Sequence, residues 1–204
     1  SPQAEAFRDL CTNLFDPTFL EKELRVVLFS SASAGDGGTM VAVNAAATLA
    51  YAGHKVIVMD CDLRLPIVGD GFGLEDIGLT DYIKGDVTAE EILQETWVPN
   101  LQIIASGPTT IGPITTLSNE KVRELIEHLR TISDYVFLAS SPLVFREDHV
   151  TSDACVLASK VDGVVLSLDS NTINPKTAKK VIKLLHGAKA NLIGMILNDV
   201  VGEA

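Results

Sequence analysis

The sequence has no long hydrophobic run, although 47% of its 204 residues are apolar. Its apolar runs are short and are separated by charged residues, whereas a helix that spans a bilayer needs about 20 consecutive apolar residues. No charged segment followed by an apolar one precedes the first predicted element, and the chain begins with Ser1. We therefore expect one soluble domain, residues 1–204, that is either processed or excised from a longer chain, with excision favoured.

Basic residues are also scarce. The chain has 16 lysines and arginines against 27 aspartates and glutamates, which gives a formal net charge of −11. Nucleic acids and anionic lipids carry charge of the same sign, so electrostatic attraction to either is disfavoured. We expect a protein partner and no nucleic acid.

Cysteine and histidine are too few and too scattered for a metal centre. The three cysteines are odd in number and follow no metal-binding spacing, which is typical of a cytosolic protein. They are Cys11, Cys61 and Cys155. The four histidines form no pair at helical spacing with another ligand type. They are His54, His128, His149 and His186.

Short apolar runs rich in β-branched residues alternate with helical patterns. The predicted strands are 25–30, 55–59, 101–105, 135–139, 163–168 and 192–197, and the predicted helices are 39–52, one opened by a Thr88–Glu91 capping box, 119–130 and 174–187. Strands that are apolar throughout are covered on both faces, so the sequence predicts an α/β fold with a doubly wound, mostly parallel sheet flanked by helices. Ligands of such folds bind at the carboxyl ends of strands. The glycine-rich stretch 69–85 is predicted to be a surface loop with one short helix, which is either a lid over that site or a plain connection.

A glycine-rich loop follows the first predicted strand and opens a helix, which is the setting of a phosphate-binding P-loop. The predicted nucleotide-binding residues are Gly35, Asp36, Gly37, Gly38, Thr39 and Met40. Gly38 occupies the position of the P-loop lysine, while Thr39 keeps the hydroxyl that binds Mg²⁺. Losing one charge-assisted hydrogen bond of about 1.5–3 kcal/mol weakens triphosphate binding by roughly one to two decades. The loop either binds anions weakly or is a glycine-rich turn inherited with the fold.

Further motifs give the chain a family resemblance. Asp60-Cys61-Asp62-Leu63-Arg64 follows the second predicted strand, Glu5-Ala6-Phe7-Arg8 lies near the start, and Gly194-x-x-Leu197-Asn198 lies near the end. Together with the loop, these motifs resemble the bacterial tyrosine kinases of capsule and exopolysaccharide export, the BY-kinases. The resemblance implies a P-loop NTPase-like fold of the deviant Walker A type that uses ATP or ADP with Mg²⁺. It implies catalytic roles for Asp60 and Asp62, and Mg²⁺ binding by Thr39, Asp60 and Asp62.

The sequence departs from the family pattern at four positions of the nucleotide site, of which Ala34 and Met40, in place of a proline and a threonine, are the milder. Gly38 stands where the family has its lysine, and Ala139 stands where the family has an aspartate that holds the water shell of Mg²⁺. The resemblance therefore implies an impaired kinase. Asp60 has a second interpretation, because a carboxylate at a strand end also satisfies nearby backbone donors. Arg64 pairs with either an acid of this chain or a subunit partner.

The N-terminal segment 1–20 is predicted to be a helix that mediates oligomerisation. In the family, an acidic residue and two arginines at three-residue spacing join subunits into a ring. Glu5 and Arg8 keep this spacing, but Cys11 replaces the second arginine. The resemblance thus implies a homo-oligomer that is weaker than in other members.

The expected function is a regulatory or scaffolding module of polysaccharide polymerisation and export. It acts in the cytoplasm at the inner face of the plasma membrane, beside a chain-length-determining copolymerase in the same or a separate chain. Two alternatives stay open. One is an active autokinase that uses a displaced lysine, with Lys84 favoured over Lys55. The other is a partition-type ATPase switch.

Overall fold

The computed structural model describes residues 2–15, 23–108, 112–146, 149–172 and 174–198. The helices are α1 (Pro2–Phe15), α2 (Gly38–Tyr51), α3 (Val68–Phe72), α4 (Leu79–Lys84), α5 (Pro113–Ser118), α6 (Glu120–Ile132), α7 (Asp153–Ala158) and α8 (Pro175–Gly187). The strands are β1 (Val26–Ser31), β2 (Val56–Cys61), β3 (Gln94–Glu95), β4 (Leu101–Ile104), β5 (Tyr135–Ser140), β6 (Val144–Arg146), β7 (His149–Val150), β8 (Gly163–Asp169) and β9 (Leu192–Asn198).

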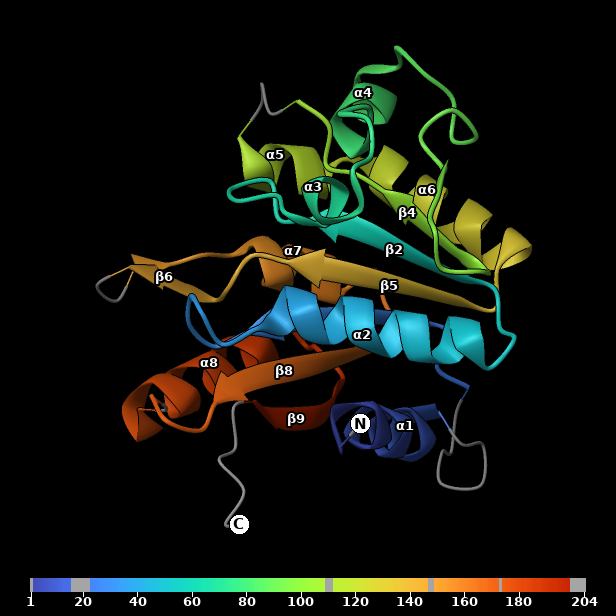
Figure 1. Cartoon of the computed structure of the whole chain (residues 1–204). Coiled ribbons are helices and arrows are strands. Elements are labelled where there is room, and N and C mark those ends of the chain that lie inside the picture. The colour runs from blue at the N-terminus through green and yellow to red at the C-terminus, as the bar shows by residue number, and fades with distance from the viewer. Residues whose placement is uncertain (1, 16–22, 109–111, 147–148, 173, 199–204) are drawn as a thin grey trace.

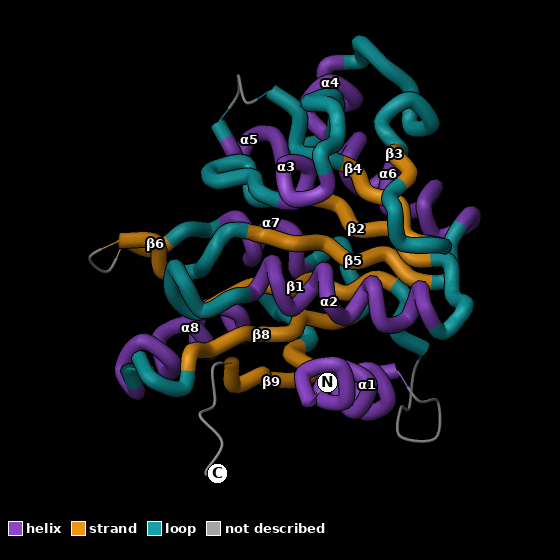
Figure 2. Tube along the Cα trace, viewed as in Figure 1, coloured by secondary structure: helices purple, strands orange, loops and turns teal. Residues whose placement is uncertain are grey.

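A seven-stranded sheet in the order β3-β4-β2-β5-β1-β8-β9 forms the centre of the molecule (Figures 1 and 2). Every neighbouring pair is parallel except β3 and β4, which are antiparallel. Strands β6 and β7 form a separate antiparallel pair. The predicted doubly wound, mostly parallel sheet is confirmed.

Helices cover both faces of this sheet, which explains why its inner strands are mostly apolar. Val27 and Phe29 of β1 pack in one core with α1 and α2. Val26 and Leu28 point to the opposite face and pack in a second core with α4 to α8. Helix α2 lies close against the sheet because small alanines, such as the fully buried Ala45, face the strands.

Two local expectations differ from the structure. The Thr88–Glu91 capping box forms, since the Thr88 N–H donates to Glu91 Oε2 over 2.7 Å and the Glu91 N–H donates to Thr88 Oγ1 over 3.3 Å. The chain turns there, however, and enters β3 instead of a helix. The stretch 69–85 contains two short helices, α3 and α4, rather than one. The capping contacts specify a helical turn, and the downstream pairing of β3 with β4 ends it.

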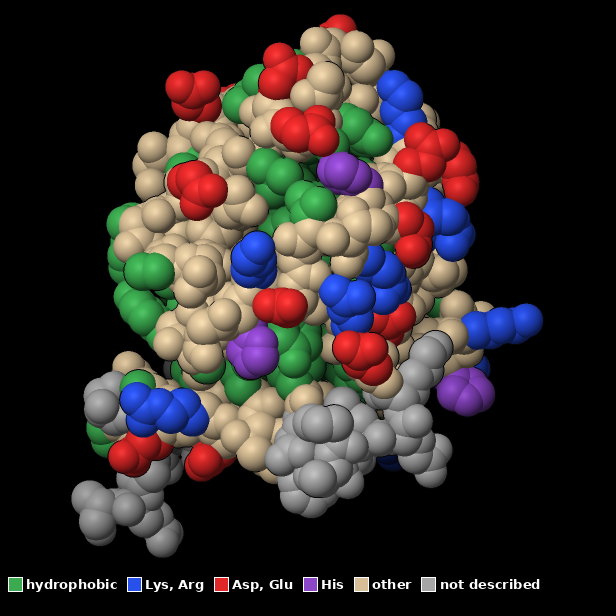
Figure 3. Space-filling model, turned by 90° about the vertical axis from the view of Figure 1, so that its right-hand side faces the viewer, with side chains coloured by type: hydrophobic (Ala, Val, Ile, Leu, Met, Phe, Trp, Pro, Cys, Tyr) green, Lys and Arg blue, Asp and Glu red, His purple; other side chains and the backbone are tan. Residues whose placement is uncertain are grey.

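The face in Figure 3 carries basic and acidic side chains intermixed rather than a continuous basic area. Within the part of the chain that the structure describes, no helix is both long enough and apolar enough to cross a membrane.

The carboxylate of Asp162 ties the start of β1 to α6. It accepts the backbone N–H groups of Arg25 and Val26 over 3.0 and 2.8 Å, and both terminal nitrogens of the Arg130 guanidinium over 2.9 and 2.8 Å. Burial raises the pKa of Asp162, but the hydrogen bonds from Arg130 and the two backbone groups outweigh it and leave the pKa below its usual value. The ionised carboxylate thus contributes to the free energy of unfolding.

We expect Asp162→Ala to lower the free energy of unfolding by about 2–3 kcal/mol at pH 7, because it leaves a partly buried guanidinium and two backbone donors without their acceptor. Since the pKa is lower in the folded state, this stabilisation is present above about pH 4 and is lost as the pH falls through the folded-state pKa. Urea unfolding followed by circular dichroism measures both effects. Glu120→Ala, which removes an exposed ion pair with Arg123, is the control and should cost under about 0.5 kcal/mol. A difference between native chain and Asp162→Ala that persists unchanged below pH 3 would contradict this account.

Candidate functional site

The loop between β1 and α2 has the backbone expected of a P-loop. Gly35 and Gly37 adopt left-handed conformations, with φ of 97° and 80°, and α2 begins at Gly38. Asp36 is buried, and its carboxylate accepts the N–H of Ser33 over 2.8 Å. The hydroxyl of Ser167 on β8 donates to the carbonyl of Asp36. Burial, and then the nearby Asp169, raise the pKa of Asp36. The loop is therefore held by contacts within the protein.

A hollow of about 280 Å³ opens in front of this loop. Loop residues and the first turn of α2 form one wall, and Asp62, Leu65, Ile67, Ser140 and Pro142 contribute the rest. Of the six predicted nucleotide-binding residues, all but Asp36 line it. Its described lining contains no lysine or arginine, and Asp62 is its one carboxylate.

Asp60, at the end of β2, is fully buried and organises the turn that follows it. Its Oδ1 accepts the N–H of Asp62 over 3.0 Å, and its Oδ2 accepts the N–H groups of Ile67 and Val68 over 3.2 and 3.0 Å. Burial raises the pKa of Asp60 to about 6, although these backbone donors oppose the rise. Asp60 lines a separate hollow of about 240 Å³ instead of the loop hollow. The backbone-satisfying interpretation of this carboxylate thus has direct support.

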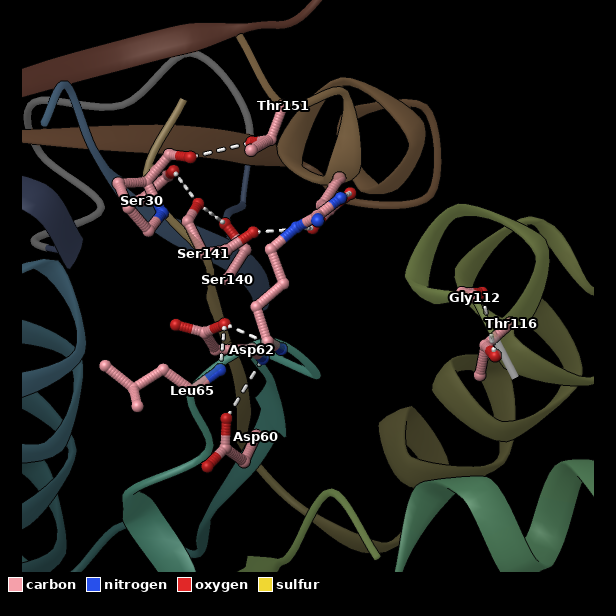
Figure 4. A network of polar contacts seen from close by, with 12 residues as sticks. Ser30, Asp60, Asp62, Leu65, Gly112, Thr116, Ser140, Ser141 and Thr151 are labelled. Carbon is pink, nitrogen blue, oxygen red and sulfur yellow. Dashed lines mark hydrogen bonds and ion pairs between the residues drawn. The ribbon is translucent and has the colours of Figure 1, made fainter. Parts of the chain in front are cut away.

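Asp62 lies on the same turn but faces the loop hollow (Figure 4). Its Oδ1 accepts the N–H groups of Arg64 and Leu65, each over 3.1 Å. Burial raises the pKa of Asp62, and the hydrogen bonds to the turn lower it in part. Of the predicted Mg²⁺ ligands, Thr39 and Asp62 share a hollow and Asp60 does not line it.

Arg64 pairs with a buried acid of its own chain. Its Nε and one terminal nitrogen donate to the two oxygens of Asp153 over 2.7 and 3.0 Å, and the Ser141 hydroxyl donates to the same carboxylate over 2.7 Å. The Ser141 carbonyl in turn accepts the hydroxyl of Ser30 over 3.1 Å (Figure 4). This network joins the ends of β1, β2 and β5 to the start of α7. The sequence suggested an acidic partner for Arg64 but did not single out Ser141 or Asp153.

Comparisons with known proteins agree with this architecture. No protein-family model matches the sequence. The chain is 30% identical to the tyrosine-protein kinase YwqD of Bacillus subtilis, over 97% of this chain and 81% of the relative. It is 29% identical to the tyrosine-protein kinase CpsD of Streptococcus agalactiae, over 96% of this chain and 83% of the relative. This chain belongs to the BY-kinase family.

Comparison with solved structures also relates this chain to the BY-kinases. The chimerical protein CapA2B2 matches with a TM-score of 0.91 at 25% identity, over 99% of this chain and 87% of that one. The septum site-determining protein MinD of Pyrococcus horikoshii, complexed with Mg-ADP, matches with a TM-score of 0.67 at 23% identity, over 85% of this chain and 69% of that one. The MinD likeness shows the shared fold alone. The higher coverage and TM-score favour the BY-kinases over the partition-type ATPases.

Gly38 and Ala139 are the two positions at which the family resemblance implies a lysine and an aspartate. Gly38 lines the loop hollow. Ala139 is fully buried on β5 and lies opposite Asp60 in the register of β2 and β5. A methyl group accepts no hydrogen bond, so position 139 offers nothing to a metal-bound water.

Neither candidate for a displaced lysine lines the hollow. The ammonium of Lys84 on α4 lies 3.8 Å from Asp81 Oδ1. Lys55 precedes β2, where its backbone N–H donates to Asp134, and so lies at the opposite end of that strand from Asp60. The geometry gives no support to the displaced-lysine BY-kinase.

The predicted oligomerisation residues lie on α1. Glu5 and Arg8 are exposed, whereas Cys11 is buried and its thiol donates to the carbonyl of Ala45 on α2 over 3.6 Å. Burial raises the pKa of Cys11 to about 12. Arg8 lines a hollow of about 650 Å³ between α1 and the end of α2. Cys11 thus anchors α1 to the domain, and an oligomeric role for Glu5 and Arg8 stays a prediction.

If Asp60 is primarily a structural group, Asp60→Ala destabilises the protein without any nucleotide present. We expect a loss of about 2–4 kcal/mol in the free energy of unfolding, because three backbone N–H groups in or near the core lose their acceptor. Urea denaturation measures it. Asp70→Ala, an exposed acid of the same hollow, is the matched control and should change stability by under about 0.5 kcal/mol. Equal stability of native chain and Asp60→Ala would contradict the structural role.

Proposed function

We propose that this chain is a catalytically impaired BY-kinase domain that works as a regulatory or scaffolding module in capsule or exopolysaccharide polymerisation and export. The observation that carries the proposal is the lining of the loop hollow, whose described residues include no lysine or arginine. Phosphoryl transfer depends on cations that neutralise charge in the transition state. A hollow without such a group gives that reaction little help.

The residues of the hollow do not fit a Mg²⁺–nucleotide well. Thr39 supplies a hydroxyl and Asp62 a carboxylate, but Ala139 supplies no acceptor for a metal-bound water. Asp60 already accepts three backbone N–H groups. Among the described residues, no group of three or more His, Cys, Asp or Glu side chains is placed to hold a metal ion. We therefore propose that ATP and ADP bind weakly or not at all.

The proposed partner is a polysaccharide copolymerase of the plasma membrane, in the same or a separate chain. Support comes from the solved chimerical protein CapA2B2 and from a relative in Klebsiella pneumoniae that is described as a putative tyrosine-protein kinase in a cps region. The acidic net charge of −11 favours a protein partner over direct contact with anionic lipid. The proposed location is the cytoplasmic side of the membrane, with the partner or a further segment as anchor.

We expect no tyrosine phosphorylation above background when the purified chain is incubated with ATP and Mg²⁺, because the hollow does not neutralise the transferring phosphoryl group. Mass spectrometry of phosphotyrosine on the chain and on an added acceptor peptide measures it. YwqD, prepared in parallel, is the positive control.

Two variants show where any observed tyrosine phosphorylation arises. Asp62→Asn should abolish phosphorylation that arises at this site, and Lys84→Ala should abolish it if Lys84 acts as the displaced lysine. Phosphorylation at a rate close to that of YwqD and lost in Asp62→Asn would overturn the proposed function. A signal unchanged in both variants would identify a contaminating kinase.

A further inference from the structure

The first residue of α2 lies unusually close to the neighbouring strand. A Cβ atom built on Gly38 would lie 2.9 Å from the carbonyl carbon of Ser30, and 3.1 Å from both the Ser30 oxygen and the Ser31 nitrogen. A Cβ that lies under 3.0 Å from a backbone atom forces one of the two segments to move.

The backbone on the other side of this contact has little freedom to move. Ser30 and Ser31 end β1, which pairs with β8 on one side and β5 on the other. The Ser30 hydroxyl also donates to the carbonyl of Ser141 over 3.1 Å. Relief of the contact would therefore have to come from the loop and α2.

The loop is restrained as well. A Cβ on Gly37 would meet the side-chain amide of Asn198 at the end of β9, and the φ of Gly37 is 80°. The carbonyl of Asp36 accepts the hydroxyl of Ser167. The hydrogen bond from β8 thus restrains the loop, and Asn198 of β9 leaves no room for a side chain at Gly37.

We infer that Gly38 is a specificity-determining residue, because its close contact with β1 excludes a side chain from this position of the hollow. Helix α2 packs so tightly against β1 that position 38 admits no side chain, so the present backbone has no room for the lysine of the family pattern. This inference rests on the proposed function and deepens it, because the loss of phosphate binding then lies in the backbone as well as in the missing amine.

The close contact reverses the usual effect of a helix substitution. Replacing a helical glycine by alanine stabilises most proteins, because alanine has the better helix propensity and the less flexible unfolded chain. Gly38→Ala should instead lower the melting temperature by about 4 °C or more, because the steric cost of the added methyl group exceeds the gain in helix propensity.

Gly71→Ala in α3 is the matched control, because no atom lies within 4 Å of a Cβ built there. It should leave the melting temperature unchanged or raise it by about 1–3 °C. Differential scanning calorimetry of the three proteins makes the comparison. A melting temperature of Gly38→Ala at or above that of the native chain would overturn the inference.

A second experiment tests whether ATP binding appears when the two side chains of the family pattern are introduced. Gly38→Lys combined with Ala139→Asp returns both family side chains, and Ala139→Asp alone is its control. We expect the double variant to melt below the single variant and to gain no binding of ATP with Mg²⁺. A double variant that melts with the single variant and binds ATP would also overturn the inference.

The two proposals fail separately. Phosphorylation by the native chain that is lost in Asp62→Asn would remove the proposed function, whatever the melting temperatures show. A stable Gly38→Ala variant would remove the steric role of Gly38 and leave the proposed function untouched.

Discussion

The buried carboxylate of Asp153 is satisfied by the forked guanidinium of Arg64 and by the hydroxyl of Ser141, and this contact joins the loops that form the loop hollow. An unpaired charge at such a depth would cost several kcal/mol, so the three groups have to keep their places together. Through Arg64 the network fixes the acidic turn after β2, and through Ser141 it fixes the loop after β5. The shape of the hollow thus follows from contacts that need no nucleotide.

The two carboxylates that the family resemblance assigns to catalysis also accept hydrogen bonds from within the protein. Both carboxylate oxygens of Asp60 accept hydrogen bonds from backbone N–H groups of the following turn. One carboxylate oxygen of Asp62 accepts two N–H groups of that turn, and Asp62 lines the hollow. Gly38 adds no charged group to the wall of the hollow, and Ala139, buried on β5, does not line it. The chain has the BY-kinase fold, and the polar groups of the turn after β2 are hydrogen-bonded within that fold, which supports the proposed scaffolding function.

The sequence predicted the central sheet well, because five of its strands are apolar runs that are almost entirely buried, and such runs depend little on context; the edge strand β9 was also predicted from its apolar run, although its side chains are only partly buried. It did not predict β3, β6 or β7, which have two or three residues each and form only because a partner strand lies beside them. The Thr88–Glu91 capping box was predicted and forms, but the helix predicted to follow it does not form. Local capping chemistry is read from neighbouring residues, whereas the length of an element is set by tertiary contacts.

The site was predictable to a similar degree. The glycine-rich loop and the acidic turn were found from motifs, and all but one of the predicted loop residues line the hollow. The sequence did not predict that Asp60 and Asp62 line different hollows, because the direction of each side chain depends on the folded backbone. The sequence suggested an acid as one possible partner of Arg64, but it could not identify Asp153, which lies 89 residues away. The contact of Gly38 with β1 depends on how closely α2 packs against the strand, and a single sequence contains no signal for that distance.

Calorimetric titration of the native chain with ATP and with ADP, each with and without Mg²⁺ and beside YwqD, tests the central claim most directly. The account predicts binding at least about tenfold weaker than that of YwqD, with little dependence on Mg²⁺, because a charge-assisted hydrogen bond and a metal contact are both missing. Binding within about tenfold of YwqD that strengthens with Mg²⁺ would contradict it, since the hollow would then hold phosphates that its residues are not expected to hold.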